Sequence, residues 1–453
     1  MAGDEPLFGT DGVRGKAGHG VLAPQSVVRL GIALGEWLRA HGDAAKPALL
    51  GGDTRSSREE IAAALSAGLS RCAIRTIDVG VLPTAALALL IDDYDASCAA
   101  VISASHNPAD DNGIKFFTGH GRKLDDAQSH FIEERWRALA AAPTDGVRDL
   151  REPHPEGAER YLARLIAAAK APDLSRLTIA LDLAHGAASD VGPRLFARLG
   201  ARVVVTGAAP DGRNINAGVG SLHPEGVAGL VVKSGADFGL AVDGDADRSV
   251  LADERGAIVD GDAILALVAD DLLARGALTG GGIVGTVMSN LGLELFLKAR
   301  GLTLVRTPVG DRHVAAALRE RGMNLGGESS GHVIFGADLD YLGDGLYTAV
   351  RVAELLVRRG LSLSQAAAGF SRAPQANAAV RVAARPPLSQ VAGFKEILSA
   401  SEERLGREGR IVIRYSGTEP VCRVMVEGVD AALVSALSKE LADFLRRAIG
   451  ARS

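Results

Sequence analysis

Short apolar runs bounded by Gly or Asp alternate along the chain with longer stretches in which apolar residues recur at helical spacing. The short runs predict strands at residues 47–50, 99–102, 177–181, 201–205, 238–242, 281–287, 302–305, 410–414 and 422–426. The longer stretches predict helices at 25–40, where Val28, Ile32 and Leu38 follow the helical period, and at 261–276. Strands that are apolar throughout are typical of sheets covered on both faces, so we expect α/β layers.

The length of the chain and three polar segments bear on its domain organisation. With 453 residues the chain exceeds what one ordinary core supports, and three or four domains are expected. Segments rich in Pro, Gly or charge lie at 141–157, 253–256 and 370–387. We expect the chain to pass from one domain to the next at these three segments.

Composition and charge exclude several classes of protein. Hydrophobic residues make up 47% of the chain, and the net charge is -5 without a dense Lys/Arg cluster, so we expect a globular protein with no nucleic-acid partner. No apolar run approaches the ~18 residues of a membrane helix, and the acidic N-terminal segment does not resemble a secretory signal. Cys72, Cys98 and Cys422 lie far apart, as expected for free thiols in a cytoplasmic protein.

Polar loops that contain glycine recur between the predicted elements, and ligands of open α/β sheets bind at such loops. Two of them, at 8–15 and 51–57, carry Arg14 and Arg55. Glycine lets the backbone approach a ligand, and a planar guanidinium group suits phosphate. A structural turn with a solvated arginine explains the same residues, so both interpretations stay open.

A third loop, SASHNP at 103–108, follows the predicted strand at 99–102. A serine at a strand end, such as Ser105, acts as a nucleophile if its oxygen is held and activated. Ser and Asn also favour turns and helix caps, which is the structural alternative. Lys115, on the strand-like segment GIKFF, is a candidate proton donor or phosphate ligand.

The fourth loop, DGDADR at 243–248, places Asp243, Asp245 and Asp247 at alternate positions. An extended loop would turn the three carboxylates to one side, where they repel one another by about a few kcal/mol. A cation among them would remove that cost, and oxygen ligands suit Mg²⁺ or Ca²⁺ rather than zinc. The segment lacks the longer ligand ladder of a calcium loop, so Mg²⁺ fits better, and a solvated acidic turn is the alternative.

Two further loops carry groups suited to a sugar phosphate. Glu328, Ser330 and His332 lie close together among glycines and offer donors and acceptors for ring hydroxyls. The segment 410–428 offers hydroxyls, glycine and guanidinium groups that suit a phosphate dianion, on Arg414, Ser416, Gly417, Thr418 and Arg423. Polar turns explain either segment taken alone.

The four motifs SASHNP, DGDADR, GESSGH and RYSGTEP, in this order, resemble those of the α-D-phosphohexomutase superfamily, and the resemblance extends over essentially the whole chain. It implies an α/β fold with four domains around a central cleft, three of them mixed α/β sandwiches and the last a smaller α+β domain. We expect a phosphoserine-loop domain, an Mg-binding domain, a sugar-binding domain and a phosphate-binding domain, at residues 1–152, 153–254, 255–370 and 371–453.

The resemblance also implies roles for individual residues. Ser105 matches the serine that carries a phosphate, and one Mg²⁺ per chain is expected on that phosphate and on the three aspartates of DGDADR. Glu328 and Ser330 match readers of the sugar hydroxyls, and the RYSGTEP loop with Arg423 matches the site of the substrate phosphate. Groups that stabilise charge or transfer protons are expected at Arg14, Lys115, Arg248 and His332.

The reaction implied is the isomerisation of a sugar monophosphate through a bisphosphorylated hexosamine. LFGTDGVRG, VGTVMSNLGLE and VGDRHV are most similar to the branch that acts on glucosamine phosphates, while Ala246 is common in the mannose and glucose phosphate branch, which remains the alternative. An aspartyl phosphatase would leave SASHNP and SGTEP without roles, and a sugar-phosphate sensor would not need Ser105. The expected partners are sugar phosphates, and the expected state is a monomer or homodimer.

Overall fold

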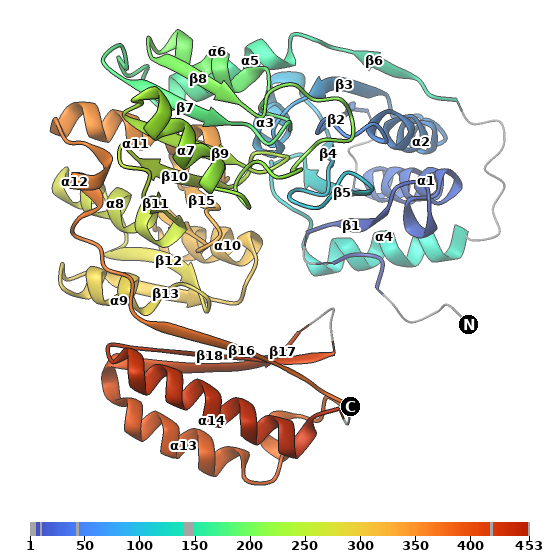
Figure 1. Ribbon diagram of the computed structural model, residues 1–453. Coiled ribbons are helices and arrows are strands. Elements are labelled where there is room, and N and C mark those ends of the chain that lie inside the picture. Colours follow the sequence, from blue (N-terminus) through green and yellow to red (C-terminus); the bar gives the residue numbers. More distant parts are fainter. Residues whose placement is uncertain (1–5, 10, 42–44, 140–147, 417–419, 452–453) are drawn as a thin grey trace.

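The computed structural model describes residues 6–9, 11–41, 45–139, 148–416 and 420–451, and the chain forms four sheets with helices packed on them (Figure 1). All nine strands predicted from apolar runs are present. The two predicted helices are α1 (Pro24–Ala40), which begins with a proline in its first turn, and α8 (Gly261–Ala274), whose N-terminal amides are capped by Asp260.

The first sheet has six strands in the order β1-β5-β4-β2-β3-β6. Its strands are β1 (Val13–Lys16), β2 (Ala48–Gly52), β3 (Thr76–Val81), β4 (Cys98–Ile102), β5 (Asp111–Thr118) and β6 (Arg151–Pro153). Alternate residues of β2 enter different cores, with Leu49 on one face and Leu50 on the other. Its helices are α1, α2 (Arg58–Ser70), α3 (Thr84–Leu89) and α4 (Asp126–Ala138).

The second sheet has five strands in the order β11-β10-β9-β7-β8, and the third has four in the order β13-β12-β14-β15. The second comprises β7 (Thr178–Asp182), β8 (Arg202–Thr206), β9 (Phe238–Val242), β10 (Ser249–Asp253) and β11 (Ile258–Val259), with α5 (Gly157–Ala168), α6 (Val191–Arg198) and α7 (Glu225–Ser234). The third comprises β12 (Gly282–Thr286), β13 (Thr303–Thr307), β14 (Leu325–Gly327) and β15 (Val333–Phe335), with α8, α9 (Leu291–Lys298), α10 (Asp311–Arg321), α11 (Gly345–Arg359) and α12 (Leu363–Ala367).

The C-terminal sheet is smaller and antiparallel, with three strands in the order β16-β18-β17. It comprises β16 (Gln375–Arg381), β17 (Gly409–Tyr415) and β18 (Val421–Gly428), packed on α13 (Phe394–Leu405) and α14 (Ala431–Ile449). The predicted fold class, three mixed α/β units and a smaller α+β unit, is confirmed. β6 and the β10–β11 hairpin lie across the boundaries expected at 152 and 254, and the exact boundaries stay a prediction.

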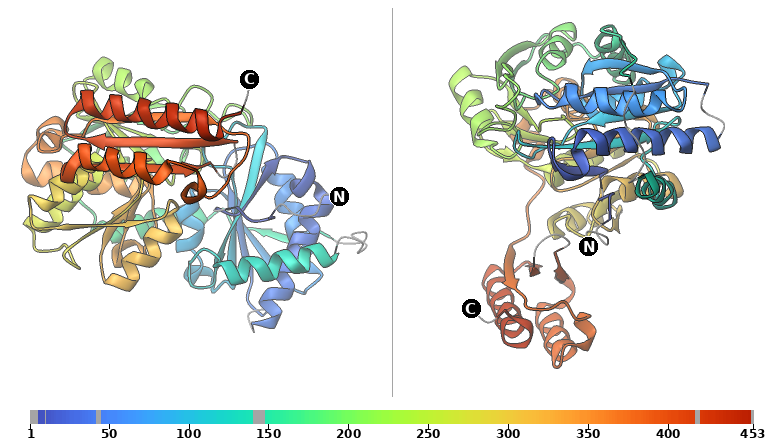
Figure 2. Two further views of the ribbon diagram at one scale, coloured as in Figure 1. Left: turned by 90° about the horizontal axis from the view of Figure 1, so that it is seen from below. Right: turned by 90° about the vertical axis from the view of Figure 1, so that its right-hand side faces the viewer.

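The hydrophobic cores explain how the four units are arranged. One continuous cluster includes Leu49 of the first unit, Leu240 of the second and Ile283 of the third, whereas Val424 and Leu441 belong to a separate cluster in the C-terminal unit. The C-terminal unit accordingly stands apart from the other three in Figure 1 and in the right-hand view of Figure 2. No helix in the described ranges combines the length and the apolar character that crossing a membrane requires.

Candidate active site

Two predicted loops from different units meet at the centre of the molecule. Ser105 follows β4 of the first sheet, and Asp243 follows β9 of the second. The Ser105 Oγ donates a hydrogen bond to Asp243 Oδ2 at 2.6 Å, although 138 residues separate them in the chain. Both side chains are buried, with 1% of each residue exposed. The structure therefore brings the candidate nucleophile directly against the candidate metal site.

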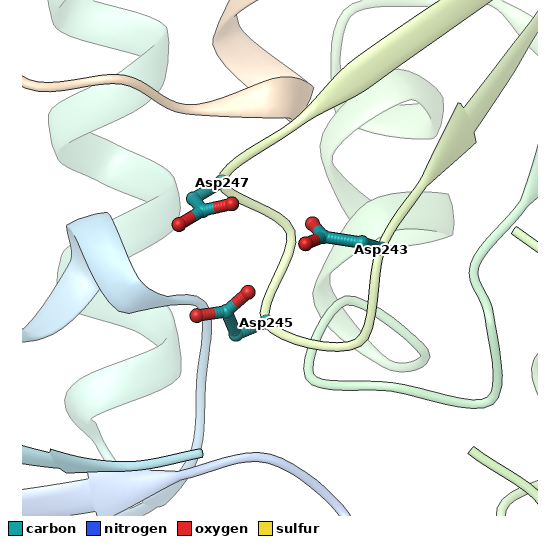
Figure 3. Close-up of side chains that lie close together, drawn as sticks. All are labelled: Asp243, Asp245 and Asp247. Atoms are coloured by element: carbon teal, nitrogen blue, oxygen red, sulfur yellow. The ribbon is translucent and has the colours of Figure 1, made fainter. Parts of the chain in front are cut away.

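The three aspartates of DGDADR converge as predicted, but the loop is not extended (Figure 3). One ligand atom from each of Asp243, Asp245 and Asp247 lies within 4.8 Å of the others. The segment forms a turn in which Ala246 has a φ of 57°. A Cβ on Gly244 would lie 2.6 Å from the Ser105 carbonyl oxygen, so this close approach of two backbones requires glycine.

Lys115 provides a cation at the edge of this cluster. Its Nζ lies 2.7 Å from Asp245 Oδ2, 3.2 Å from Asp247 Oδ2 and 2.9 Å from Asp11 Oδ2. Burial acts to lower the pKa of Lys115, but these three carboxylates outweigh it and hold the pKa well above its usual value. Lys115 is therefore an ammonium group fixed by ion pairs, as suits a residue that stabilises charge.

The cluster retains carboxylate oxygens that a metal ion would use. Within the described residues, Asp245 Oδ1 and Asp247 Oδ1 are buried and have no hydrogen-bond partner. Burial, followed by the charges of Asp247 and Asp245, raises the pKa of Asp243 well above its usual value. Unpaired buried carboxylate oxygens are costly, and a hard divalent cation is the group that carboxylates bind best. The residues present therefore fit a metal ion.

The other basic candidates surround the same cluster. Arg248 Nε lies 3.9 Å from both Asp243 Oδ2 and Asp247 Oδ1, and His332 Nδ1 lies 3.7 Å from Asp247 Oδ2. Arg14 Nη2 is 2.8 Å from Asp11 Oδ2, the carboxylate that also pairs with Lys115. All four basic residues predicted from the sequence are thus within one charged network.

The sugar-binding candidates lie on a loop joined to this network. Ser249, which follows Arg248, donates from its backbone N–H to the Gly331 carbonyl at 2.9 Å. Glu328 Oε1 accepts a hydrogen bond from the Gly310 N–H at 3.0 Å, and Ser330 is exposed. The loop is therefore anchored beside Arg248, while the hydroxyl of Ser330 faces solvent.

The structure does not bring the phosphate-loop candidates to Ser105. Arg414 and Arg423 face each other across β17 and β18 and are both exposed, and Ser416 lies at the end of β17. All three belong to the C-terminal unit, which stands apart from the triad (Figure 1). Gly417 and Thr418 lie outside the described residues.

The sequence left Arg55 open between a phosphate ligand and a solvated arginine of a structural turn, and its buried side chain fits neither. Its side chain is fully buried and donates to Asp53 and to backbone carbonyls of the serine loop. Because its side chain is buried, Arg55 cannot contact a bound ligand. Of the two arginines Arg14 and Arg55, Arg14 alone lies in the charged network.

Three contacts at the site were not foreseen from the sequence. Thr84 Oγ1 donates to Asp245 Oδ2 at 2.6 Å, and Lys123 bonds both Asp11 and Asp311. Asp11 is part of the FGTDGVRG motif, so the sequence contained a pattern that could have identified it. No motif near Lys123 in the sequence indicates that Lys123 is functional. Lys123 connects the first unit to α10 of the third, beside a cavity of about 800 Å³ that His332 also lines.

Comparisons with known proteins agree with this architecture. Profiles for phosphoglucomutase/phosphomannomutase alpha/beta/alpha domains I, II and III match residues 5–142, 159–256 and 260–373, and the profile of the C-terminal domain matches 375–444. A phosphoglucomutase/phosphomannomutase family protein from Burkholderia thailandensis has a similar structure, with a TM-score of 0.81, 25% identity and 97% of each chain covered. An Aspergillus fumigatus N-acetylphosphoglucosamine mutase, solved with GlcNAc-6P and magnesium, shares the fold at a TM-score of 0.66 and 18% identity, over 97% of this chain and 95% of that one.

Relatives found by sequence identify the family more narrowly than the similarity of fold does. The phosphoglucosamine mutase of Symbiobacterium thermophilum is 42% identical over 97% of this chain and 98% of its own length. That of Solidesulfovibrio magneticus is 43% identical over 98% of this chain and 100% of its own. The chain belongs to the phosphoglucosamine mutase family, within the α-D-phosphohexomutase superfamily.

Proposed function

We propose that this enzyme interconverts glucosamine 6-phosphate and glucosamine 1-phosphate through a phosphoserine at Ser105 and a bisphosphorylated sugar, a step that feeds amino-sugar nucleotide and cell-wall precursor synthesis. The single observation that carries the proposal is the 2.6 Å hydrogen bond from the Ser105 Oγ to Asp243, in a cluster of three buried carboxylates. Full-length relatives named phosphoglucosamine mutase support the choice of sugar over the mannose and glucose alternative.

Each half of the proposed reaction exchanges one phosphate ester for another. A sugar hydroxyl oxygen attacks the phosphorus of phosphoserine, the bond from phosphorus to Ser105 Oγ breaks, and the hydroxyl proton replaces the phosphoryl group on that oxygen. The bisphosphorylated sugar then reorients end over end in the site. The Ser105 oxygen attacks the phosphorus at the other end of the sugar and becomes phosphoserine again. Because the second half reverses the chemistry of the first, the enzyme returns to its phosphoserine form.

Charge neutralisation and positioning supply most of the rate of phosphoryl transfer. Lys115 and Arg248 lie around Ser105 and are placed to balance the charge of the transferring group, with Arg14 joined to Lys115 through Asp11. One Mg²⁺ held by Asp243, Asp245 and Asp247 would neutralise charge on the phosphoryl oxygens. Glu328 and Ser330 are proposed to orient the sugar through its hydroxyls.

The distal phosphate is proposed to bind Arg414, Ser416, Gly417, Thr418 and Arg423, which requires the C-terminal unit to close over the cleft. Closure would also exclude water, which otherwise hydrolyses the phosphoserine. Contacts between the third and C-terminal units mark the hinge. Arg410 donates to the carbonyls of Val287 at 2.8 Å and Ser289 at 2.6 Å and pairs with buried Glu427, which also accepts from Asn290 at 3.0 Å.

Replacing Arg410 by methionine is expected to change kcat and KM together, because hinge residues govern both substrate capture and closure. Leaving the buried Glu427 without its cation should also lower the unfolding free energy by about 1–3 kcal/mol. Steady-state kinetics and thermal unfolding measure the two effects. Arg404→Met is the matched control, since Arg404 makes an exposed pair with Glu440 in the same unit. Wild-type kinetics in the Arg410 variant would refute the hinge assignment.

The proposed substrate is tested by comparing kcat/KM for glucosamine 6-phosphate, glucose 6-phosphate and mannose 6-phosphate. We expect glucosamine 6-phosphate to be preferred by about 100-fold or more, since a site built to hydrogen-bond one substituent discriminates strongly against its analogue. Equal or higher kcat/KM for either of the other sugars would favour the phosphomannomutase/phosphoglucomutase assignment.

We further propose that the enzyme acts in the cytoplasm, as a monomer or homodimer, on sugar phosphates alone. Cys72, Cys98 and Cys422 are free and buried, as is usual in a reducing compartment. Sedimentation of the purified chain distinguishes the two assembly states.

A further inference from the structure

Ser105 has an unusual backbone conformation that its neighbours must maintain. Its φ is 53°, in the left-handed region that residues other than glycine rarely adopt. Its N–H donates to the Ser103 Oγ at 2.8 Å, and Ser103 Oγ in turn donates to Asp53 Oδ2 at 2.6 Å. Its carbonyl accepts from Asn216 Nδ2 at 2.9 Å and from Arg55 Nη2 at 3.1 Å. Both peptide groups beside Ser105 are therefore held by side chains.

Arg55 is the centre of this arrangement, and all five of its guanidinium N–H donors are used. Nε donates to Asp53 Oδ2 at 3.0 Å, and Nη2 donates to the carbonyls of Ser105 and Asn107, the latter at 2.8 Å. Nη1 donates to the carbonyls of Pro108 and Asp111, the latter at 2.9 Å. One side chain thus gathers four carbonyl oxygens, three from the loop at residues 105–108 and one from Asp111 at the start of β5.

The charge of Arg55 is balanced within the arrangement. Asp53 and the Arg55 side chain are both fully buried, and they pair with each other. Arg55 bonds carbonyl oxygens of the loop, whereas the contact of the loop with the triad is made by the Ser105 Oγ. It therefore shapes the loop without adding a net charge beside the triad.

We infer that Arg55, Asp53 and Ser103 are positioning residues that hold the loop 103–111 so that the Ser105 Oγ points at Asp243. The inference rests on the proposed function, which gives Ser105 its role. It goes beyond that function by assigning the orientation of the nucleophile to three residues that touch neither sugar nor phosphate. Ser103, the first residue of SASHNP, is the link between the Ser105 N–H and Asp53.

Two substitutions loosen the arrangement in different places. Arg55→Lys keeps the charge but supplies three donors in place of five, so at least two of the five acceptors of Arg55 lose this donor. Ser103→Ala removes only the hydroxyl that joins Ser105 N–H to Asp53. A displacement of about 1 Å at a reacting atom lowers rates by about 10²-fold, so kcat should fall by about 10-fold to 100-fold in either variant. KM for glucosamine 6-phosphate should change less than twofold, since other units contact the sugar.

Matched controls separate positioning from stability. Arg58→Lys replaces another buried, ion-paired arginine of the same unit, whose partners are Glu59 and Asp78 and not the serine loop. Ser66→Ala removes a buried hydroxyl that bonds Thr76 Oγ1 at 2.7 Å. Both controls should lower the midpoint of thermal unfolding while leaving kcat per folded enzyme within twofold of wild type.

The experiment measures kcat, KM and thermal unfolding for all four variants, together with the rate at which dephosphorylated enzyme takes a phosphoryl group from glucose 1,6-bisphosphate. That rate should fall with kcat in the Arg55 and Ser103 variants alone. If Arg55→Lys does not fold, Ser103→Ala decides the question by itself. Wild-type kcat and phosphorylation rate in Ser103→Ala overturn the inference. Full activity in Ser105→Ala would instead overturn the proposed function, so the two failures are distinguishable.

Discussion

Replacing Ser105 by alanine is expected to reduce mutase turnover to background while the enzyme stays folded. The serine oxygen is the atom that holds the phosphoryl group between the two halves of the proposed reaction, and its side-chain neighbours are Asp243 Oδ2 at 2.6 Å and His106 Nδ1 at 3.3 Å. Lys115, a cation of the same cluster, is an ammonium group paired with three carboxylates and offers no lone pair. The loss should exceed about 10⁴-fold, because a double displacement without its nucleophile has no route.

The fold should tolerate this change. The substitution removes the hydrogen bond from Ser105 Oγ to Asp243 and the 3.3 Å contact of that oxygen with His106 Nδ1, with a net contribution to stability of about 1–2 kcal/mol. The left-handed backbone at residue 105 is no harder for alanine than for serine. A coupled assay for glucosamine 1-phosphate, a thermal unfolding curve and intact mass before and after incubation with glucose 1,6-bisphosphate measure turnover, fold and phosphorylation.

Ser97→Ala is the appropriate control for that measurement. Ser97 is buried in the same unit, and among the residues that the structure describes its hydroxyl bonds only the Pro47 carbonyl, at 3.2 Å. The Ser97→Ala variant should have the turnover of the wild type, and its mass should increase by one phosphoryl group after incubation with glucose 1,6-bisphosphate. Retention of turnover in the Ser105 variant, or phosphate incorporation at another residue, would exclude the phosphoserine mechanism.

Local patterns were sufficient to predict the elements, whereas the meeting of the Ser105 loop with the DGDADR loop followed from the resemblance to the superfamily. The run 238–242 predicted β9, and its carboxyl end carries Asp243, as expected where strands deliver ligands in α/β sheets. The convergence of the three aspartates was also correct, although its stated cause was not. A turn through Ala246, with a φ of 57°, brings the carboxylates together, and no sequence periodicity encodes that conformation.

The role of Arg55 illustrates what local patterns do not contain. Its motif, GGDTRSS, suits a phosphate loop equally well, and the difference depends on four carbonyls that lie 50 to 56 residues further along the chain. Lys123 is a similar case, because its partner Asp311 belongs to another unit. Such roles follow from tertiary packing, which decides whether a charged side chain faces a ligand or forms ion pairs and hydrogen bonds inside the protein.

Removing divalent metal with a chelator is expected to stop turnover, and adding Mg²⁺ is expected to restore it. The physical reason lies in the buried oxygens of Asp245 and Asp247 that have no hydrogen-bond partner within the described residues. Lys115 neutralises one side of the cluster only, through Asp245 Oδ2 and Asp247 Oδ2. A loss of about 4 kcal/mol of charge stabilisation corresponds to a fall of about 10³-fold in rate.

A readout independent of activity makes this prediction sharper. Mg²⁺ that binds only the folded enzyme at 100 times its Kd should stabilise it by about 2.7 kcal/mol, which appears as a rise in the thermal midpoint. Asp245→Asn should lose that rise, while Asp253→Asn, at the buried end of β10 outside the triad, should keep it. Full turnover in chelator, or equal stabilisation of the two variants by Mg²⁺, would show that the three carboxylates serve the fold and that Lys115 and Arg248 supply their counter-charge without a metal ion.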